Sequence, residues 1–490
     1  MRITNQMMIN NNMANVQINK YQLNKLDTQF STEKKISKPS DDPIIAIRAL
    51  RLRSSLDQVT QYLNKNIPDA SSWLKTTEGA LDEANSILTD LYSYCNQGST
   101  DSYSSAERQT IAGSLNKLRD AFYAEGDVEY AGRYVFTGYM TDKPLNYQSD
   151  EAAAGVDYTI TQKFTRDDLS TKTVYTNSYT NEDILNLDVH TDAAGNVITP
   201  NVADVQRLRI GYTDVDQTGP FSLTLSDGTT LPAGGAATIT TDVNYIPAED
   251  EVAFNPATGE ILLGENAYRQ VYEADGCQFT YRKDNFVKGN QDPTMYFDCV
   301  DNNTGIVYNK ENEDIEYNIN FSQKLKVNTE ANEAFNIYLG RDIDDLITSV
   351  QNVIDIEAQL EQVEGMMKQD KYSDEASQEK LAKLKEGLTK QKELAEEEMT
   401  DAFENGIAQM KGYQQQVSLA KADVGNRETR LNLTKSRLTE QKTNFQALKS
   451  QNEDIDLEEV VIGYSAASLV YNASLTAASK VVQQTLLDFL

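Results

Sequence analysis

Two stretches of heptad spacing, one near each end of the chain, constrain the fold most strongly. From Pro43 onward, apolar residues recur every three or four positions, and the same period returns from Met410 to Leu469. Such spacing places apolar side chains along one stripe of a long helix that packs against another helix. We therefore expect a mostly α fold, in which the N- and C-terminal helices pair in an elongated coiled-coil-like bundle.

Local signals indicate where these helices begin and break. Asp42 suits an N-cap, and Pro43 suits the first helical position, where its missing N–H does no harm. Two successive spacings of four beside Pro68 predict a relaxed supercoil or a kink. The segment 452–456 is rich in cap and turn formers, so we expect a helix break there. The heptad spacing nevertheless continues through that break at Ile455, Ile462, Ala466 and Leu469.

Charge and residue counts exclude several functions. The 75 acidic and 45 basic residues leave a net charge of −30, which opposes binding to nucleic acid or to anionic lipid. His190 is the only histidine, so a HExxH zinc helix and a multi-histidine metal site are excluded. Phosphate-binding loops and nucleophile elbows are absent from the sequence, and acidic residues are too abundant for any carboxylate pair to be informative. We predict no enzyme activity, no cofactor and no metal.

The middle of the chain has a different composition. Between residues 146 and 330, Thr, Tyr, Val, Asp and Gly dominate, and turn signals such as Asn255-Pro256-Ala257-Thr258-Gly259 recur. These features predict a β-rich insert with its clearest strands at 221–225, 260–263 and 305–308. Helical spacing returns from Ile343 to Met367, and 16 of the 31 residues from 368 to 398 are charged, as in a solvated helix.

These patterns divide the chain into four expected parts. Residues 1–42 with 457–490 form terminal polymerisation helices, and residues 43–145 with 399–456 form a long helical rod with a small β-hairpin. Residues 146–330 form the β-rich surface insert, and residues 331–398 form a charged helical extension or hairpin.

Smaller motifs leave some interpretations open. Cys277 and Cys299 lie 22 residues apart in the insert and either pair or remain free. In GRYVFTGYMTDKPL we expect a hairpin-like buttress with Tyr134 and Phe136 on one face and a turn at Gly138. Several aromatic residues of the insert are either buried strand residues or a surface that stacks on sugars: Tyr268, Tyr272, Phe279, Tyr281, Phe286, Tyr296 and Phe297.

The two ends of the chain lack enough apolar residues to fold by themselves. Five apolar residues in the first forty contribute roughly 8–15 kcal/mol on burial, whereas ordering thirty backbone residues costs on the order of 30–60 kcal/mol. The segment 460–479 is too polar for a membrane span, and no signal peptide is evident at the start. We expect both ends to be ordered by neighbouring copies, although a purely intramolecular bundle fits the same pattern. The predicted assembly interface comprises Ile9, Met13, Val16, Leu23, Phe30, Ile462, Leu469, Leu475, Val482, Leu486, Leu487 and Phe489.

Five motifs, in order, carry a resemblance to a known family. They are MRITNQMM, ISKPSDDPIIAIRAL (Ile36–Leu50), GRYVFTGYMTDKPL (Gly132–Leu145), DVGNR (Asp423–Arg427) and TLLDFL (Thr485–Leu490). Together they resemble the flagellar hook-filament junction proteins, or hook-associated protein 3, within the flagellin superfamily. The match covers about the first 145 and the last 80–90 residues.

The resemblance implies an extracellular structural protein of the bacterial flagellum, exported by the type III apparatus without signal cleavage. It implies four partners: the other hook-associated junction protein, flagellin, copies of itself in a ring, and an export chaperone. Flagellin itself is the nearest alternative, but Pro39 and Pro43 around Ser40-Asp41-Asp42 and the ending Asp488-Phe489-Leu490 favour the junction proteins. The large middle departs from the pattern, which leaves open an insert that also binds glycan or a host surface.

Overall fold

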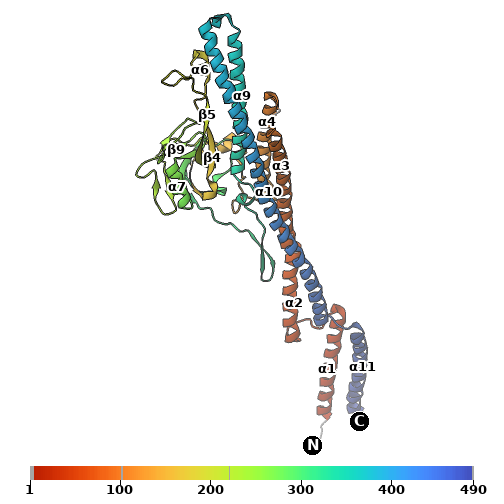
Figure 1. Cartoon of the computed structure of the whole chain (residues 1–490). Helices are drawn as coiled ribbons and strands as arrows, with labels where there is room; N and C mark the ends of the chain where they lie inside the picture. The colour runs from red at the N-terminus through yellow and green to blue at the C-terminus, as the bar shows by residue number, and fades with distance from the viewer. Residues whose placement is uncertain (1–4, 101–102, 220, 488–490) are drawn as a thin grey trace. The chain divides into compact units, whose positions relative to one another are not determined.

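The computed structural model describes residues 5–100, 103–219 and 221–487, and divides into two compact units (Figure 1). The first unit gathers Met1–Ala70, Tyr317–Leu325 and Thr429–Leu490, and the second gathers Ser71–Glu316 and Lys326–Glu428. The predicted class is confirmed, because long helices occupy both ends of the chain and the strands gather in the middle. The four-part division of the chain remains a prediction.

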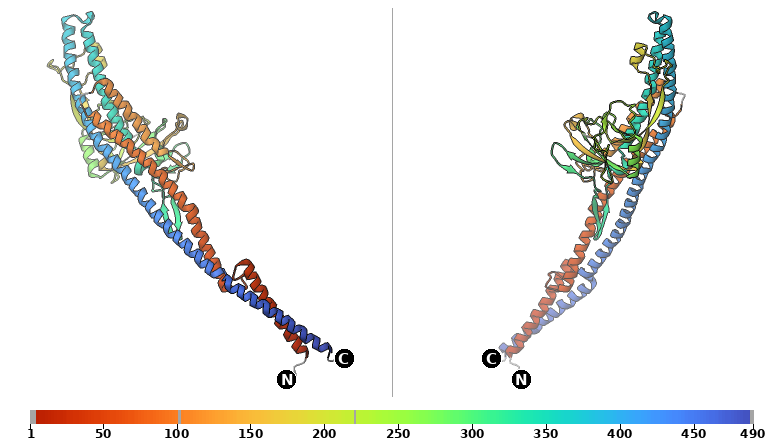
Figure 2. Two further views of the ribbon diagram at one scale, coloured as in Figure 1. Left: turned by 90° about the vertical axis from the view of Figure 1, so that its right-hand side faces the viewer. Right: turned by 60° about the vertical axis from the view of Figure 1, so that its left-hand side comes forward.

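The first unit is built from helices at the two ends of the chain. Its terminal helices α1 (Asn5–Thr32) and α11 (Leu457–Leu487) lie side by side in both views of Figure 2. Helix α2 spans Pro43–Gln61, and the last part of α10 (Glu375–Glu453) also belongs to this unit. The predicted N-cap is confirmed, since the Asp42 carboxylate accepts the N–H groups of Ile44 and Ile45. The predicted helix break is confirmed between Glu453 and Leu457.

The irregularity expected beside Pro68 is a π-helix at Tyr62–Asn66, between α2 and α3 (Ile67–Gly98). Proline cannot donate to the helical ladder, and an inserted π-turn is one way to accommodate that defect. The hairpin of β14 (Glu316–Asn320) and β15 (Gln323–Lys326) reaches this place. Asn66 donates to the Asn318 carbonyl at 2.7 Å, and the Tyr62 and Phe321 rings meet edge to face at 5.7 Å.

In the second unit, α3 is followed by α4 (Ser105–Ala124) and later by α9 (Tyr338–Met367), which turns back into α10. Buried side chains such as Leu88, Leu115 and Leu346 join these helices. The remaining short helical segments of the chain are Glu125–Asp127, α5 (Asp150–Ala153), Arg166–Asp168, α6 (Asn181–Asn186), α7 (Glu265–Glu273), Pro293–Met295, α8 (Ala331–Ala334) and Asp370–Tyr372.

The β insert holds two sheets with a shared aromatic core. One has the order β4-β5-β10-β9-β8 and the other β13-β12-β3-β11-β6-β7, antiparallel except for the pair β8 and β9. Phe221, Phe254 and Phe279 meet in the core with ring centroids 4.8–5.8 Å apart. The strands are β3 (Tyr158–Phe164), β4 (Ser170–Thr176), β5 (Asn201–Arg209), β6 (Leu223–Leu225), β7 (Thr230–Leu231), β8 (Thr238–Ile239), β9 (Val252–Asn255), β10 (Glu260–Leu263), β11 (Cys277–Lys283), β12 (Asp298–Asp301) and β13 (Val307–Tyr308).

Charged side chains fasten the insert to α9. Arg207 and Arg209 of β5 reach the Asp345 carboxylate at 2.6 and 3.0 Å, and Arg209 also pairs with the buried Asp342. The nearby Asp342 and Asp345 charges raise the pKa of Arg209 although its burial opposes this. These pairs hold strand β5 of the first sheet against the start of α9.

The hairpin prediction for GRYVFTGYMTDKPL requires a correction. The paired strands are β1 (Glu129–Tyr130) and β2 (Arg133–Tyr134), and the turn between them lies at Ala131-Gly132, which the sequence analysis did not predict. The predicted turn at Gly138 is confirmed, because Gly138 has positive φ and the Met140 N–H donates to the Thr137 carbonyl at 3.0 Å. Val135 and Phe136 are both buried, and Phe136 meets Phe335 at 4.9 Å, because the chain leaves strand geometry after Tyr134. The alternation of faces expected from a continuous strand is therefore wrong.

Candidate assembly interface

The terminal helices meet along stripes of unequal side-chain size. On α1, Ile9, Val16 and Leu23 are half-buried toward α11. Most of the half-buried positions of α11 carry small residues, although Tyr464 and Tyr471 are also half-buried, and a Cβ at Gly463 would approach the Leu26 side chain at 3.6 Å. Small residues allow two helix backbones to approach closely. Because this face holds little apolar volume, the contact leaves most of the large side chains of α11 elsewhere.

The opposite faces of both helices are exposed. On α1, Met13 is 52% and Phe30 is 47% exposed, although Phe30 still stacks on Tyr464 at 6.4 Å. On α11, Ile462 is 71%, Leu469 is 74% and Leu475 is 42% exposed. The expected seam through Ile462 and Leu469 therefore does not face the helix partner in the same copy. Helix α10 ends at Glu453, and α11 begins as a separate helix at Leu457. Helix α1 packs against the face of α11 that carries mostly small residues.

The last four residues of the predicted interface lie near the end of the chain. Val482, Leu486 and Leu487 lie within α11, and the positions of their side chains are outside the description. Phe489 lies outside the described residues.

Polar contacts join the segment around the α1–α2 link to the segment where α10 ends. Arg53 donates to both carboxylate oxygens of Glu453, at 2.8 and 2.6 Å, and Glu453 is 3% exposed. These hydrogen bonds raise the pKa of Arg53. The Lys34 ammonium pairs with Asp454, and its hydrogen bond lowers the pKa of that carboxyl. The backbone N–H of Lys35 donates to the Glu453 carbonyl at 2.7 Å. The starting direction of α11 is therefore set by the link between α1 and α2.

Comparison with known proteins supports the resemblance drawn from the motifs. Residues 3–141 match the family model of the bacterial flagellin N-terminal helical region. This part of the chain is therefore similar to the flagellin N-terminal helical region. It begins before α1 and ends after the β1–β2 hairpin, so it contains α1, α2, α3 and α4.

Curated relatives share this flagellin-like character. The flagellar hook-associated protein 3 of Salmonella typhimurium is 28% identical over 165 residues, which cover 33% of this chain and 51% of that protein. Its Escherichia coli counterpart is 28% identical over 160 residues, covering 32% and 50%. The chain spans about half the length of these curated relatives. A flagellin of Clostridium tyrobutyricum is 28% identical over 120 residues, covering 24% and 32%.

Two solved structures are also similar to this chain. The flagellar hook associated protein-3 of Legionella pneumophila is 12% identical, with a TM-score of 0.32 over 82% of this chain and 97% of that one. Xanthomonas campestris FlgL is 12% identical, with a TM-score of 0.32 over 81% and 99%.

The interface predicted from the sequence includes only about half of the exposed large apolar residues of α1 and α11. The prediction followed single heptad stripes, so it omitted large apolar residues that lie off those stripes. A search for apolar residues on the opposite helix face would have found several of them. The omitted residues that are more than 40% exposed are Met7, Met8, Ile18, Tyr21, Leu457, Val461 and Val470.

Helix α11 also meets a membrane criterion. Its segment Leu457–Lys480 is long and apolar enough, by length and composition alone, to cross a bilayer, and 6% of its most apolar window is buried. Ser465, Ser468 and Asn472 interrupt this segment. An exposed apolar helix face is also typical of a surface that binds another protein chain.

The remaining candidate sites are accounted for by packing. In the insert, Phe279, Tyr281 and Phe286 are buried, Tyr268, Tyr296 and Phe297 pack against the core, and Tyr272 is 46% exposed. Only Phe279 and Tyr281 lie in a strand, β11, so the buried-strand interpretation is correct for these two and wrong for the others, which belong to α7 or to loops. Their positions favour a packed core over a sugar-stacking surface. Cys277 and Cys299 are free and buried in β11 and β12, on either side of β3. His190 stacks on Tyr179 at 4.5 Å.

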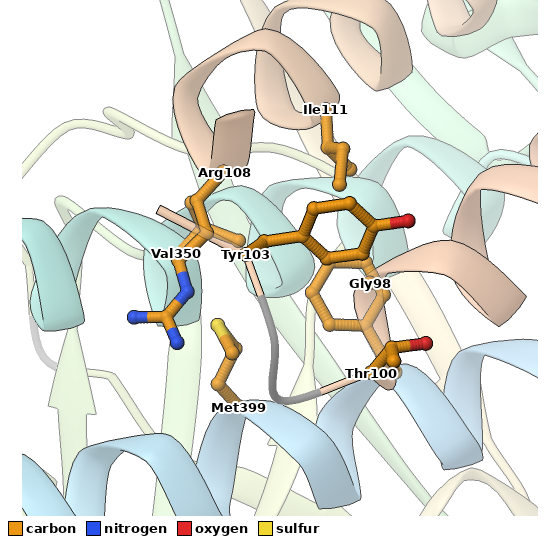
Figure 3. Close-up of a pocket in the computed structure, with 8 residues that line it drawn as sticks. Gly98, Thr100, Tyr103, Arg108, Ile111, Val350 and Met399 are labelled. Atoms are coloured by element: carbon orange, nitrogen blue, oxygen red, sulfur yellow. The ribbon is translucent and has the colours of Figure 1, made fainter. Parts of the chain in front are cut away.

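A pocket in the second unit is also explained by helix packing (Figure 3). The Arg108 guanidinium reaches the Glu357 carboxylate at 3.4 Å and the Glu396 carboxylate at 3.1 Å, so its charge is already balanced. Among the described residues, no group of three or more His, Cys, Asp or Glu side chains could hold a metal ion. The pocket is lined by Gly98, Thr100, Tyr103, Arg108, Ile111, Val350, Met399 and Phe403.

Proposed function

We propose that this chain is a structural subunit of the bacterial flagellum that joins the hook to the flagellin filament. The observation that carries the proposal is the apolar surface of the two terminal helices. Six large apolar side chains of α1 and six of α11 are more than 40% exposed. Covering such a surface would contribute on the order of 10 kcal/mol before the costs of association.

The comparisons support the flagellar assignment. The exposed surface lies partly in the flagellin N-terminal helical region, and two relatives are named flagellar hook-associated protein 3. On this proposal the protein is structural rather than catalytic. It lies outside the cell, after export without a cleaved signal peptide.

Its partners follow from a place between hook and filament. The terminal helices contact copies of the same chain in a ring, the other hook-associated junction protein on the hook side, and flagellin on the filament side. Before export, the same apolar helices need a cover, which a chaperone would provide.

A flagellin-like filament subunit is the second candidate, favoured by the similarity to the Clostridium tyrobutyricum flagellin. The two roles differ in how many copies the flagellum needs. A junction protein is needed in few copies at one place, whereas a filament subunit makes up the filament itself.

Deletion of the gene, followed by electron microscopy and analysis of the culture medium, tests the proposal. We expect hooks without filaments and flagellin released into the medium. Re-expression of the intact chain should restore filaments. Normal filaments in the deletion strain would contradict the proposal, and loss of the main filament protein itself would favour the flagellin-like alternative.

A further inference from the structure

We propose that the exposed face of α2 binds the first turns of α11 in a neighbouring copy of this chain. This inference rests on the proposed function, because it names a second surface by which copies assemble. The exposed face of α2 is called the basic face below, and comprises Ile44, Ile47, Arg48, Leu50 and Arg51.

The basic face is apolar at its centre. Ile44 is 65%, Ile47 is 53% and Leu50 is 62% exposed, whereas Ala46 and Ala49 on the other side of α2 are buried. Helical spacing places these three residues on one side, about one and a half turns long. Three large aliphatic residues exposed together on a short helix are typical of a contact surface.

The same face is positively charged in a strongly acidic protein. Residues 34–53 hold six basic and two acidic residues, whereas the whole chain has a net charge of −30. Three of the six are engaged: Lys34 with Asp454, Arg53 with Glu453, and the Lys35 ammonium with the Gln451 carbonyl.

The charges left over lie beside the aliphatic residues. Arg48 and Arg51 are exposed, and neither forms an ion pair within the described part of the chain. Of the two acids nearby, Asp42 caps α2, and Asp41 accepts the N–H groups of Ser37 and Lys38. The basic face is therefore suited to an acidic partner with an apolar surface.

The start of α11 has the complementary character, and is called the acidic face below. Leu457 is 51%, Val461 is 41% and Ile462 is 71% exposed. Glu458 and Glu459 are exposed between them and form no ion pair within the described residues. Their backbone N–H groups donate to the cap residue Asp456, which leaves both glutamate side chains available.

The basic face and the acidic face are both exposed in a single copy, so we place the contact between them at the boundary of two copies. When a given pair of copies makes this contact only once, the interface is head-to-tail and propagates into a ring or a helix, whereas the same contact made reciprocally closes as a two-fold dimer. Charge complementarity then fixes which neighbour surface meets α2. This pairing places a contact on α2, beyond the terminal helices themselves.

Charge reversal in the purified full-length protein tests the pairing. We expect sedimentation velocity at low salt to show self-association that is at least about tenfold weaker in Arg48→Glu/Arg51→Glu. Glu458→Arg/Glu459→Arg should weaken it similarly, and combining all four substitutions should restore it to within a few-fold of the native chain. Lys380→Glu/Lys435→Glu is the matched control, because both lysines are exposed and unpaired among the described residues. Equal circular dichroism and thermal unfolding of all variants exclude misfolding.

Several outcomes would overturn the pairing. They are a native chain that does not associate, reversal variants that associate normally, or a fourfold variant that is no better than either double variant. Oxidation of a mixture of Ile47→Cys and Ile462→Cys chains should link one chain to the other, and absence of that product also contradicts the pairing. Binding of the basic face to anionic phosphatidylglycerol vesicles, with normal self-association of Arg48→Glu/Arg51→Glu, would identify a lipid surface instead. The gene deletion tests the junction role separately, so failure of the pairing leaves that role standing.

Discussion

The β insert and the pair of terminal helices bury their apolar residues to very different extents. One core of 25 buried apolar residues, all but Ile337 from the insert, lies between its two sheets, and three of its phenylalanine rings meet within 6 Å. Along α1 and the described side chains of α11, Val460 alone is a buried apolar residue. The insert therefore has an apolar core of its own, whereas we propose that the terminal pair is completed by surfaces of other molecules.

The largest expected effect is a core truncation in the insert. Phe254→Ala should lower the free energy of unfolding by about 3–5 kcal/mol, because Phe254 is fully buried among aromatic neighbours. Chemical denaturation followed by near-ultraviolet circular dichroism would measure this loss. A change below about 1 kcal/mol would mean that the insert is not packed as described.

Acid should weaken the insert through Glu260. Burial alone would raise the pKa of this carboxyl, but Arg207 and Lys172 outweigh it and lower the pKa to about 2. A carboxyl with a depressed folded pKa stabilises the fold above its unfolded pKa, and that stability is lost as the pH falls toward 2. This contribution is roughly 3 kcal/mol.

Glu260→Gln tests this effect. The variant should be less stable than the native chain at pH 7, because Arg207 and Lys172 lose their charged partner. Its stability should then fall less between pH 5 and pH 2, as measured by denaturation at each pH. Parallel pH profiles for the two proteins would contradict the assigned role of Glu260.

A smaller effect is expected where α11 begins. Arg53→Ala leaves the buried Glu453 carboxylate without its ion-pair partner and should cost about 1 kcal/mol locally, since Arg53 itself is half exposed. Hydrogen exchange should become roughly fivefold faster around residues 33–36 and 453–457. Arg51→Ala, compared with Arg53→Ala in isolated monomers, is the matched control, because Arg51 is exposed and has no ion pair in the described structure.

The smallest effect on the monomer should come from the exposed face of α11. Ile462→Ser/Leu469→Ser should change the free energy of unfolding by less than about 0.5 kcal/mol, because both side chains are more than 70% exposed. The same variant should fail to restore filaments in the deletion strain. A strongly destabilised monomer would show that these side chains serve the fold of one copy rather than assembly.

The sequence predicted the features that depend on local chemistry. The Asp42 cap, a helix irregularity near Pro68, the break after Glu453 and the strand Glu260–Leu263 all follow from residues that lie close together in the chain. Each is set by a cap, a proline or a period of two, which a single sequence displays directly.

Features that depend on distant partners could not be predicted. Strands β3 and β11 pair across more than 100 residues, and Arg207 finds its acids on β10 and α9 among 75 candidates. The face of α11 was misassigned for the same reason. Heptad spacing identifies an apolar stripe, but the size of the facing side chains decides which face the partner helix takes.

Hydrogen exchange of the full-length protein, measured first on isolated monomers and then on the assembled form, tests the central claim most directly. We predict rapid exchange along α1 and α11 in the monomer, slow exchange throughout the insert core, and protection of both terminal helices upon assembly. Slow exchange along both terminal helices in a monomer that does not associate would contradict the account.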